Sequence, residues 1–234
     1  MIPFGKDTTE AGSHRLLGCR WGDSQPSLES SVETNAGWIA QKLAEPYDVR
    51  KAWSRWVPEL AYGRHLAPPP PDSRHAAVLA LLYPSQGQWR LPLIERTTDK
   101  TVHSGQVSLP GGAMDPHESP ETCALRELEE ELGIASGSCR LCGRLTTTYI
   151  FASNYLVTPC VAITDAQPNF CPNPSEVASL IELPIDELKN DARYGRHQIS
   201  RRGVVLAAPH LEFQGHRIWG ATSMILAEFV ARLG

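Results

Sequence analysis

One run of the chain restricts its fold more than any other. It is RELEEELG, residues 126–133, which holds four glutamates within six consecutive positions. A helix turns by about 100° per residue, so Glu127, Glu130 and Glu131 share one face while Glu129 points the opposite way. The apolar stripe beside these acids is formed by Leu125, Leu128 and Leu132. The run therefore predicts an amphipathic helix whose acids lie at the border of a core.

The sequence also marks both ends of this helix. Ser119 is a good N-cap residue and Pro120 suits the first helical position, while Gly133 suits the left-handed position that follows a helix. Upstream, GQVSL at 105–109 has the pattern of a strand, and the segment 109–116 is rich in turn residues. The expected unit is a strand, a tight loop and a helix.

Two interpretations of the acidic face remain at this stage. Glutamate is a good helix former, and a charge run is commonly a solvated face. Like charges spaced three and four residues apart nevertheless destabilise an isolated helix, which favours a nearby positive partner. Hard cations such as Mg²⁺ prefer carboxylate oxygens and are commonly shared with substrate phosphates, so a divalent cation is the natural candidate.

Read from Gly112, the stretch GAMDPHESPETCALRELEEELGI resembles the Nudix box, G-x5-E-x7-R-E-U-x-E-E-x-G-U, with U a bulky aliphatic residue. It matches at every fixed position, namely Gly112, Glu118, Arg126, Glu127, Leu128, Glu130, Glu131, Gly133 and Ile134. So many constrained positions make the match specific. The resemblance implies an α/β fold, the Nudix α/β/α sandwich with a mixed β-sheet. It also implies a pyrophosphohydrolase that uses Mg²⁺ or Mn²⁺ to cleave a diphosphate joined to another moiety.

The resemblance assigns roles to individual residues. Glu127, Glu130 and Glu131 would hold the metal, and one of the carboxylates would orient or deprotonate the attacking water. Arg126 would orient a glutamate of the cluster, helped by Glu118. Many Nudix enzymes bring a further glutamate to the metals as ligand or base, and Glu176 stands at that position here; its alternative interpretation is a solvated loop acid.

Upstream of the box, LPLIERTTDKTVHSGQVSLPGG resembles the signature of coenzyme A pyrophosphatases, a Nudix subfamily. The matching positions are Leu93, Arg96, His103, Gly105, Gln106, Pro110, Gly111 and Gly112. Two positions depart: Thr101 stands where the family has a basic residue, and Leu109 replaces an aromatic one. Arg96, Lys100 and His103 are close enough in sequence to supply the missing charge. The resemblance implies that these three, with Gly111 and Gly112, bind the substrate; ordinary surface and turn positions are the alternative for Arg96 and His103.

Composition excludes several classes of function. The formal net charge is −4 and no lysine- or arginine-rich block occurs, which argues against a nucleic-acid partner. No apolar run approaches 18 residues and the first residues lack a signal peptide's apolar stretch, so we expect no membrane span and a cytoplasmic protein. The expected partner is a small nucleotide substrate, and the sequence leaves a homodimer open.

The six cysteines raise the question of a zinc site. Cys139 and Cys142 form a C-x-x-C pair, but Cys160 and Cys171 lack that spacing. Cys160 also lies in the strand-like YLVTPCVAI, where a cysteine packs as a small hydrophobic residue. We therefore predict core and surface thiols without structural zinc.

The chain divides into an N-terminal extension, 1–71, and a Nudix domain, 72–234. In the extension, we expect short amphipathic helices at 36–46 and 49–63, and a stiff proline-rich connector at 65–75. In the domain, strands are expected at 76–84, 89–97, 139–150 and 155–164, and a closing helix at 221–233. PNPSEVASLIELPIDEL and RIWGATSMIL resemble C-terminal segments of the coenzyme A enzymes, so the resemblance covers residues 74–234.

Two other functions stay open. A Nudix-like domain that only senses a nucleotide would normally have lost a box glutamate, and none is missing here. Within the enzymes, the alternative substrate is another nucleoside diphosphate derivative: ADP-ribose, a dinucleoside polyphosphate or a nucleoside triphosphate. Activity on a panel of these compounds discriminates between them.

Overall fold

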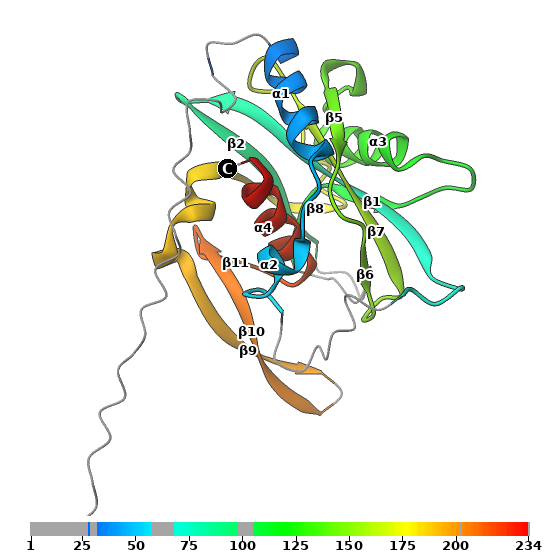
Figure 1. The fold of residues 1–234 in the computed structure, drawn as a ribbon, viewed down its shortest axis with the longest axis vertical. Helices are drawn as coiled ribbons and strands as arrows, with labels where there is room; N and C mark the ends of the chain where they lie inside the picture. Colours follow the sequence, from blue (N-terminus) through cyan, green and yellow to red (C-terminus); the bar gives the residue numbers. More distant parts are fainter. Residues whose placement is uncertain (1–27, 29–31, 58–67, 98–104, 202, 234) are drawn as a thin grey trace, which may run out of the picture.

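The computed structural model describes residues 28, 32–57, 68–97, 105–201 and 203–233. Figure 1 shows a large β-sheet with helix α3 on one side, helices α1 and α4 on the other, and a separate three-stranded sheet beside α4. These layers confirm the expected α/β class, and helices precede the sheet in the N-terminal segment as predicted.

Strand β1 (Arg74–Ser85) is the centre of the large sheet. It runs parallel to β7 (Tyr155–Ile163) and antiparallel to β2 (Gln88–Arg96) and β4 (Gly111–Ala113). The outer strands are β3 (Val107–Ser108), β5 (Arg140–Arg144), β6 (Thr148–Ile150) and β8 (Val177–Pro184). Because parallel and antiparallel pairs occur together, the sheet is mixed, as expected.

Alternating side chains of the central strands separate two apolar cores. On β1, Ala77, Leu79 and Leu81 pack with the leucines of α3 (Pro120–Leu132). Ala80 and Leu82, on the opposite face, pack in the core that contains α4. These residues are essentially inaccessible, so β1 is buried on both faces. That explains why 76–84 reads as a nearly continuous apolar run.

The second sheet consists of β9 (Tyr194–Arg201), β10 (Val204–Phe213) and β11 (His216–Trp219). β10 is the middle strand and pairs antiparallel with both neighbours. The inward face of this sheet packs under α4 (Ala221–Leu233) through Leu211, Phe213 and Ile218. None of its strands was expected from the sequence, although the closing helix lies where it was predicted.

The N-terminal helices differ in extent from the prediction. α1 is Val32–Ala44 and therefore begins earlier than residue 36, and α2 is the short Val49–Trp53. Residues 58–63, the expected remainder of the second helix, and 65–67 of the connector lie outside the described residues. Ile39 and Trp53 are buried in the same core as α4. The segment 32–57 thus packs into the same core as α4, and the division at residue 71 stays a prediction.

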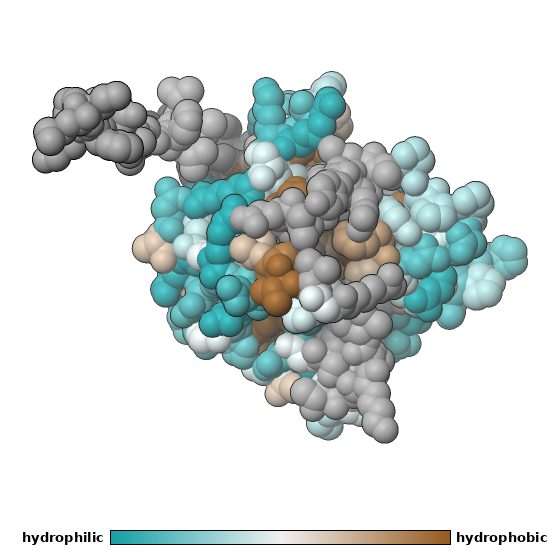
Figure 2. Space-filling model, turned by 90° about the horizontal axis from the view of Figure 1, so that it is seen from below, coloured by the Kyte–Doolittle hydropathy of each residue, from teal (hydrophilic) through white to brown (hydrophobic). Residues whose placement is uncertain are grey.

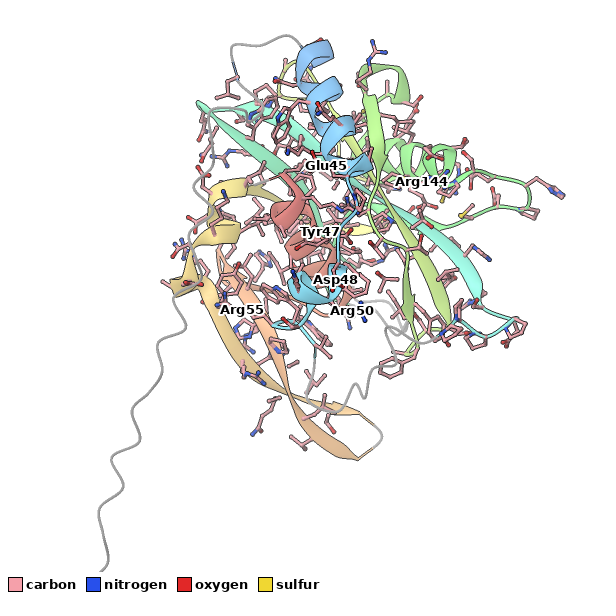
Figure 3. All side chains as sticks on the ribbon, viewed as in Figure 1. Glu45, Tyr47, Asp48, Arg50, Arg55 and Arg144 are labelled. Carbon is pink, nitrogen blue, oxygen red and sulfur yellow. The ribbon has the colours of Figure 1, made fainter. Side chains whose placement is uncertain are left out.

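A buried ion pair on α4 connects these helices to the sheet. The Glu228 carboxylate accepts hydrogen bonds from the Arg232 Nε–H (3.0 Å) and from the Thr146 backbone N–H (3.1 Å). Arg232 also donates through Nη1 to the backbone carbonyls of Leu43 (3.1 Å) and Glu45 (3.0 Å). These are among the carbonyls that the end of a helix leaves without intrahelical partners. Figure 3 labels Glu45 at this point, where the chain passes from α1 toward α2.

In the view from below, Figure 2 shows hydrophilic residues around the rim and apolar residues gathered toward the middle, partly beside grey atoms. Among the described residues, the most exposed large apolar side chains are Val205 and Phe151. No helix in the described ranges is long and apolar enough to span a bilayer.

Candidate active site

The box helix α3 has the ends that its sequence specifies. The Ser119 hydroxyl accepts a hydrogen bond from the Thr122 N–H at 3.1 Å, and Pro120 is the first helical residue. Gly133 closes the helix with φ 68°, and its N–H donates to the Glu129 carbonyl at 2.9 Å. The prediction of both caps is confirmed, because capping depends on residues adjacent in sequence.

The box glutamates differ strongly in exposure. The side chain of Glu131 is 0% exposed and that of Glu127 is 12% exposed, whereas 51% of Glu130 is accessible. Glu129 is exposed. The exposure of the side chain thus increases from Glu131, which is enclosed by protein, through Glu127 to Glu130, which is open to solvent.

Arg126 gathers three of the acids around its guanidinium. It donates to both oxygens of Glu118 at 3.0 and 3.1 Å, to Glu127 at 2.8 Å and to Glu130 at 3.0 Å. A further hydrogen bond reaches the Ala113 carbonyl on β4. The bond to Arg126 lowers the pKa of the Glu118 carboxyl, which therefore stays ionised at neutral pH. Glu118 holds the Arg126 guanidinium in place with two hydrogen bonds, and the guanidinium in turn orients the carboxylates of Glu127 and Glu130.

Arg96 approaches the same cluster from β2. Its Nη1 donates to Glu131 Oε1 at 3.1 Å and to the Gly111 carbonyl at 3.3 Å. The other oxygen of Glu131 accepts the Gly111 backbone N–H at 2.9 Å. Arg96, expected at the substrate, is thus joined to the box helix across 35 positions of sequence.

Burial and mutual repulsion perturb the carboxyl groups. Burial raises the pKa of Glu131 to about 7; Arg96 and the Gly111 N–H oppose the rise, and the charges of Glu127 and Glu176 add to it. Burial also raises the pKa of Glu127, against Arg126 and with a further contribution from Glu130 and Glu176. The carboxylates therefore lie close enough to oppose each other's ionisation.

Glu176 reaches this cluster from the turn before β8. The Asn173 side chain donates to Glu176 Oε1 at 3.2 Å, and the Glu176 carbonyl accepts the Thr97 N–H at 3.0 Å, directly after Arg96. Sequence reasoning missed Asn173 as the residue that orients Glu176. The signal was present, because Asn173 precedes Pro174 and its side chain caps the turn through the Ser175 N–H.

Two adjacent glycines on β4 make room for the cluster. Gly111 has φ 152°, and a Cβ there would lie 2.3 Å from the Ala77 carbonyl oxygen. A Cβ on Gly112 would lie 2.4 Å from the carboxylate of Glu127. In this structure both glycines serve close packing, and their expected contact with substrate stays a prediction. Lys100, Thr101 and His103 lie outside the described residues.

The donor set fits a divalent cation in chemistry and charge. Among the described residues, five glutamates, at 118, 127, 130, 131 and 176, face the two cations Arg96 and Arg126. Carboxylate oxygens are the ligands of Mg²⁺ and Mn²⁺. Within the described ranges, no three acidic, histidine or cysteine side chains are already placed to hold a metal ion; the Arg126 guanidinium lies among Glu118, Glu127 and Glu130 instead. Burial, and then the neighbouring carboxylates, raise the pKa values of Glu127 and Glu131, and a bound cation would favour their ionised forms.

The C-x-x-C pair lies on β5 and directly before it. Cys142 is buried and Cys139 partly buried, and burial raises the pKa of Cys142 to about 12. The expectation of no zinc stays a prediction.

Comparison with known proteins agrees with the geometry. The NUDIX domain family model matches residues 73–202. The uncharacterised Nudix hydrolase NudL of Photorhabdus laumondii is 34% identical over 172 residues, which are 71% of this chain and 91% of NudL. NudL of Yersinia pestis is 35% identical over 155 residues, 66% of this chain and 77% of that protein. The crystal structure of RenU, a Nudix hydrolase from M. smegmatis, is similar with a TM-score of 0.43 and 25% identity, covering 50% of this chain and 74% of RenU.

Helix α3 bears the complete Nudix box, packs against a mixed sheet and carries its acids along one edge. These features define a metal-dependent class of hydrolase. The chain belongs to the Nudix family. It is a Nudix hydrolase that acts on the diphosphate linkage of a nucleotide derivative, in a family that generally uses Mg²⁺ or Mn²⁺.

Proposed function

We propose that this chain hydrolyses the diphosphate of coenzyme A, or of an acyl-CoA, to 3′,5′-ADP and 4′-phosphopantetheine or its acyl form. The run LPLIERTTDKTVHSGQVSLPGG supports coenzyme A, because it resembles the signature of that subfamily upstream of the box. The alternative is a diphosphate in another nucleotide, such as ADP-ribose, a dinucleoside polyphosphate or a nucleoside triphosphate.

The observation that carries the proposal is the coupled cluster of Glu127, Glu131 and Glu176. The charges of Glu127 and Glu176 add to the burial that raises the pKa of Glu131. Mg²⁺ or Mn²⁺ bound there would neutralise the diphosphate oxygens and lower the pKa of a coordinated water. In this proposal Glu127, Glu130 and Glu131 hold the metal.

The remaining roles follow from exposure and contacts. Glu130 is half exposed at the end of the acidic edge, so its carboxylate can accept a proton from an attacking water. Glu176 is the second candidate for that role or a further ligand, because it reaches the cluster from a different element. Arg126 touches Glu118, Glu127 and Glu130 at once, and positions the carboxylates rather than reacting itself.

Discrimination for coenzyme A would depend on its 3′-phosphate. Arg96, Lys100 or His103 would supply the basic group that Thr101 lacks. One charge-assisted hydrogen bond is worth roughly 1.5–3 kcal/mol, so coenzyme A should be preferred over dephospho-coenzyme A by at least about tenfold. Thr101→Arg restores the family residue and should widen this preference.

The test is kcat/KM for coenzyme A, dephospho-coenzyme A, ADP-ribose, a dinucleoside tetraphosphate and a nucleoside triphosphate, each with Mg²⁺ and with Mn²⁺. We expect coenzyme A to give the highest value and the products named above. A clearly higher value for ADP-ribose or the triphosphate would replace the proposal by the alternative.

A further inference from the structure

A second concave site lies on the sheet face opposite the box helix. It is an open pocket of about 430 Å³, within the range of small-molecule sites. One wall is strand β2 with its neighbour β3, and the other is formed by β10, β11, the turn between them and His197 of β9. The side chains used below are Glu95, His197, Glu212, His216, Arg217 and Trp219.

The pocket is joined to the active site through two consecutive residues. Arg96 points toward α3 and binds Glu131, whereas Glu95 points the other way and pairs with His216 Nδ1 at 3.7 Å. Val107 also lines the pocket, and it precedes Gly111, which hydrogen-bonds Glu131, by only four residues. Four residues of extended chain span at most about 14 Å. The two places are therefore within the length of one nucleotide, which would have to pass around β3, the edge strand of the large sheet.

Aromatic rings form one side of the pocket. The rings of His197 and Trp219 stand nearly perpendicular, 80° apart with centroids at 5.4 Å. His210 fixes His197 from behind through an Nδ1···Nδ1 hydrogen bond of 3.1 Å, and the His210 ring lies over Gly195, where a Cβ would approach it to 2.9 Å. Gly195 thus leaves room for an ordered cluster of flat rings, which suits a planar heterocycle.

The charges select which part of a nucleotide fits. Among the described residues that line the pocket, Glu95 and Glu212 supply two carboxylates against the guanidinium of Arg217, and Glu95 also pairs with His216. Burial, and then the charge of Arg217, lowers the pKa of His197, so this ring adds no positive charge at neutral pH. Such a wall repels a phosphate. It favours an uncharged ring carrying an amino group, because a carboxylate accepts strong hydrogen bonds from amine donors.

We infer that this pocket binds the adenine base of the nucleotide substrate, with Trp219 and His197 against the ring and a carboxylate at its exocyclic amine. The inference rests on the proposed function in one respect, because it requires that the substrate be an adenine nucleotide. It therefore applies equally if the substrate is ADP-ribose. It makes the β9–β11 sheet the base-specificity element of the enzyme, separate from the carboxylates that act on the diphosphate.

The test uses ligands that carry no diphosphate and are not hydrolysed. Adenosine 3′,5′-bisphosphate, its inosine counterpart and 4′-phosphopantetheine are titrated calorimetrically into the whole protein. Hypoxanthine replaces the amine of adenine by a carbonyl, so we expect the inosine compound to bind at least about tenfold more weakly. Trp219→Leu should weaken the adenosine compound by a similar factor, since base stacking on an aromatic ring is a substantial part of such binding. Phe151→Leu, which removes an exposed ring outside the pocket, should change nothing.

Three results would overturn the inference: equal affinity of the wild-type protein for the adenosine and inosine compounds, no binding of the adenosine compound in the millimolar range, or loss of 4′-phosphopantetheine binding instead in Trp219→Leu. The first two use wild-type protein and do not depend on a variant that folds. Failure of the coenzyme A proposal gives a different set of results from failure of the base pocket. If ADP-ribose is the better substrate and Trp219→Leu raises its KM, the coenzyme A proposal fails and the base pocket stands.

Discussion

Replacing Gly112 by alanine should disturb the geometry of the active site while leaving the stability of the fold nearly unchanged. A Cβ at this position would lie 2.4 Å from Glu127 Oε1, whereas ordinary contact begins at 3.4 Å. The carboxylate must therefore move by about 1 Å, and a displacement of that size can lower the rate about 10²-fold. The carboxylate is the end of a flexible side chain, so the fold can accept the change. We expect kcat to fall by about 10² and the free energy of unfolding to change by less than about 1 kcal/mol.

The measurements are steady-state kinetics over a range of Mg²⁺ concentrations and urea unfolding. Because Glu127 is a proposed metal ligand, the Mg²⁺ concentration for half-maximal rate should rise as well. Gly111→Ala is the matched control, since its Cβ would meet the backbone of Ala77 at 2.3 Å and its φ is 152°. That variant should lose more than about 2 kcal/mol of stability. A kcat within threefold of wild type for Gly112→Ala would show that the position of Glu127 does not limit the reaction.

Three further results are expected. Glu130→Gln should lower kcat by at least about 10² because it removes charge from a proposed metal ligand, while Glu129→Gln should stay within about twofold; equal losses in steady-state kinetics would contradict the assignment of faces. Metal analysis of protein purified without chelator should find no stoichiometric zinc, and zinc that disappears when Cys139 and Cys142 are both changed to serine would refute this. Arg232→Met should cost roughly 3–5 kcal/mol in urea unfolding, because it leaves a buried carboxylate unpaired, and a loss below about 1 kcal/mol would mean that the ion pair contributes little.

The sequence predicts those parts of the molecule that depend on neighbouring residues. The box helix begins and ends where Ser119 and Gly133 indicate, because both caps are made within one turn. The closing helix 221–233 was also predicted correctly. Its apolar residues recur with helical spacing, so its burial is visible in the sequence alone.

The second sheet was missed although the sequence carries a signal for it. Gln214 and Gly215 join β10 to β11, with φ 51° and 82°. Two positive φ values are typical of the tight hairpin turn, and Leu211 and Phe213 alternate on the apolar face before it.

Other features of the site could not be predicted locally. Arg96 meets Glu131 only because β2 and β4 lie on the same side of β1, beside α3. The sequence suggested Arg96 as a substrate contact, and nothing in its neighbours indicates a carboxylate 35 residues away. Similarly, Gly112 was expected at the substrate, but the space that it leaves for Glu127 is visible only in three dimensions.

The Arg232 contacts also set an order of events during synthesis. The carbonyl of Lys42, at the end of α1, accepts from a guanidinium 190 positions later in the chain. At about 5–20 residues per second, roughly 10–40 s separate the two segments on the ribosome. During that interval α1 has neither its partner for these carbonyls nor the apolar face of α4, and a helix of 13 residues is marginal in water by itself. The end of α1 therefore gains its last contacts only when α4 emerges, whereas the packing of α1 against β5 can form earlier in synthesis.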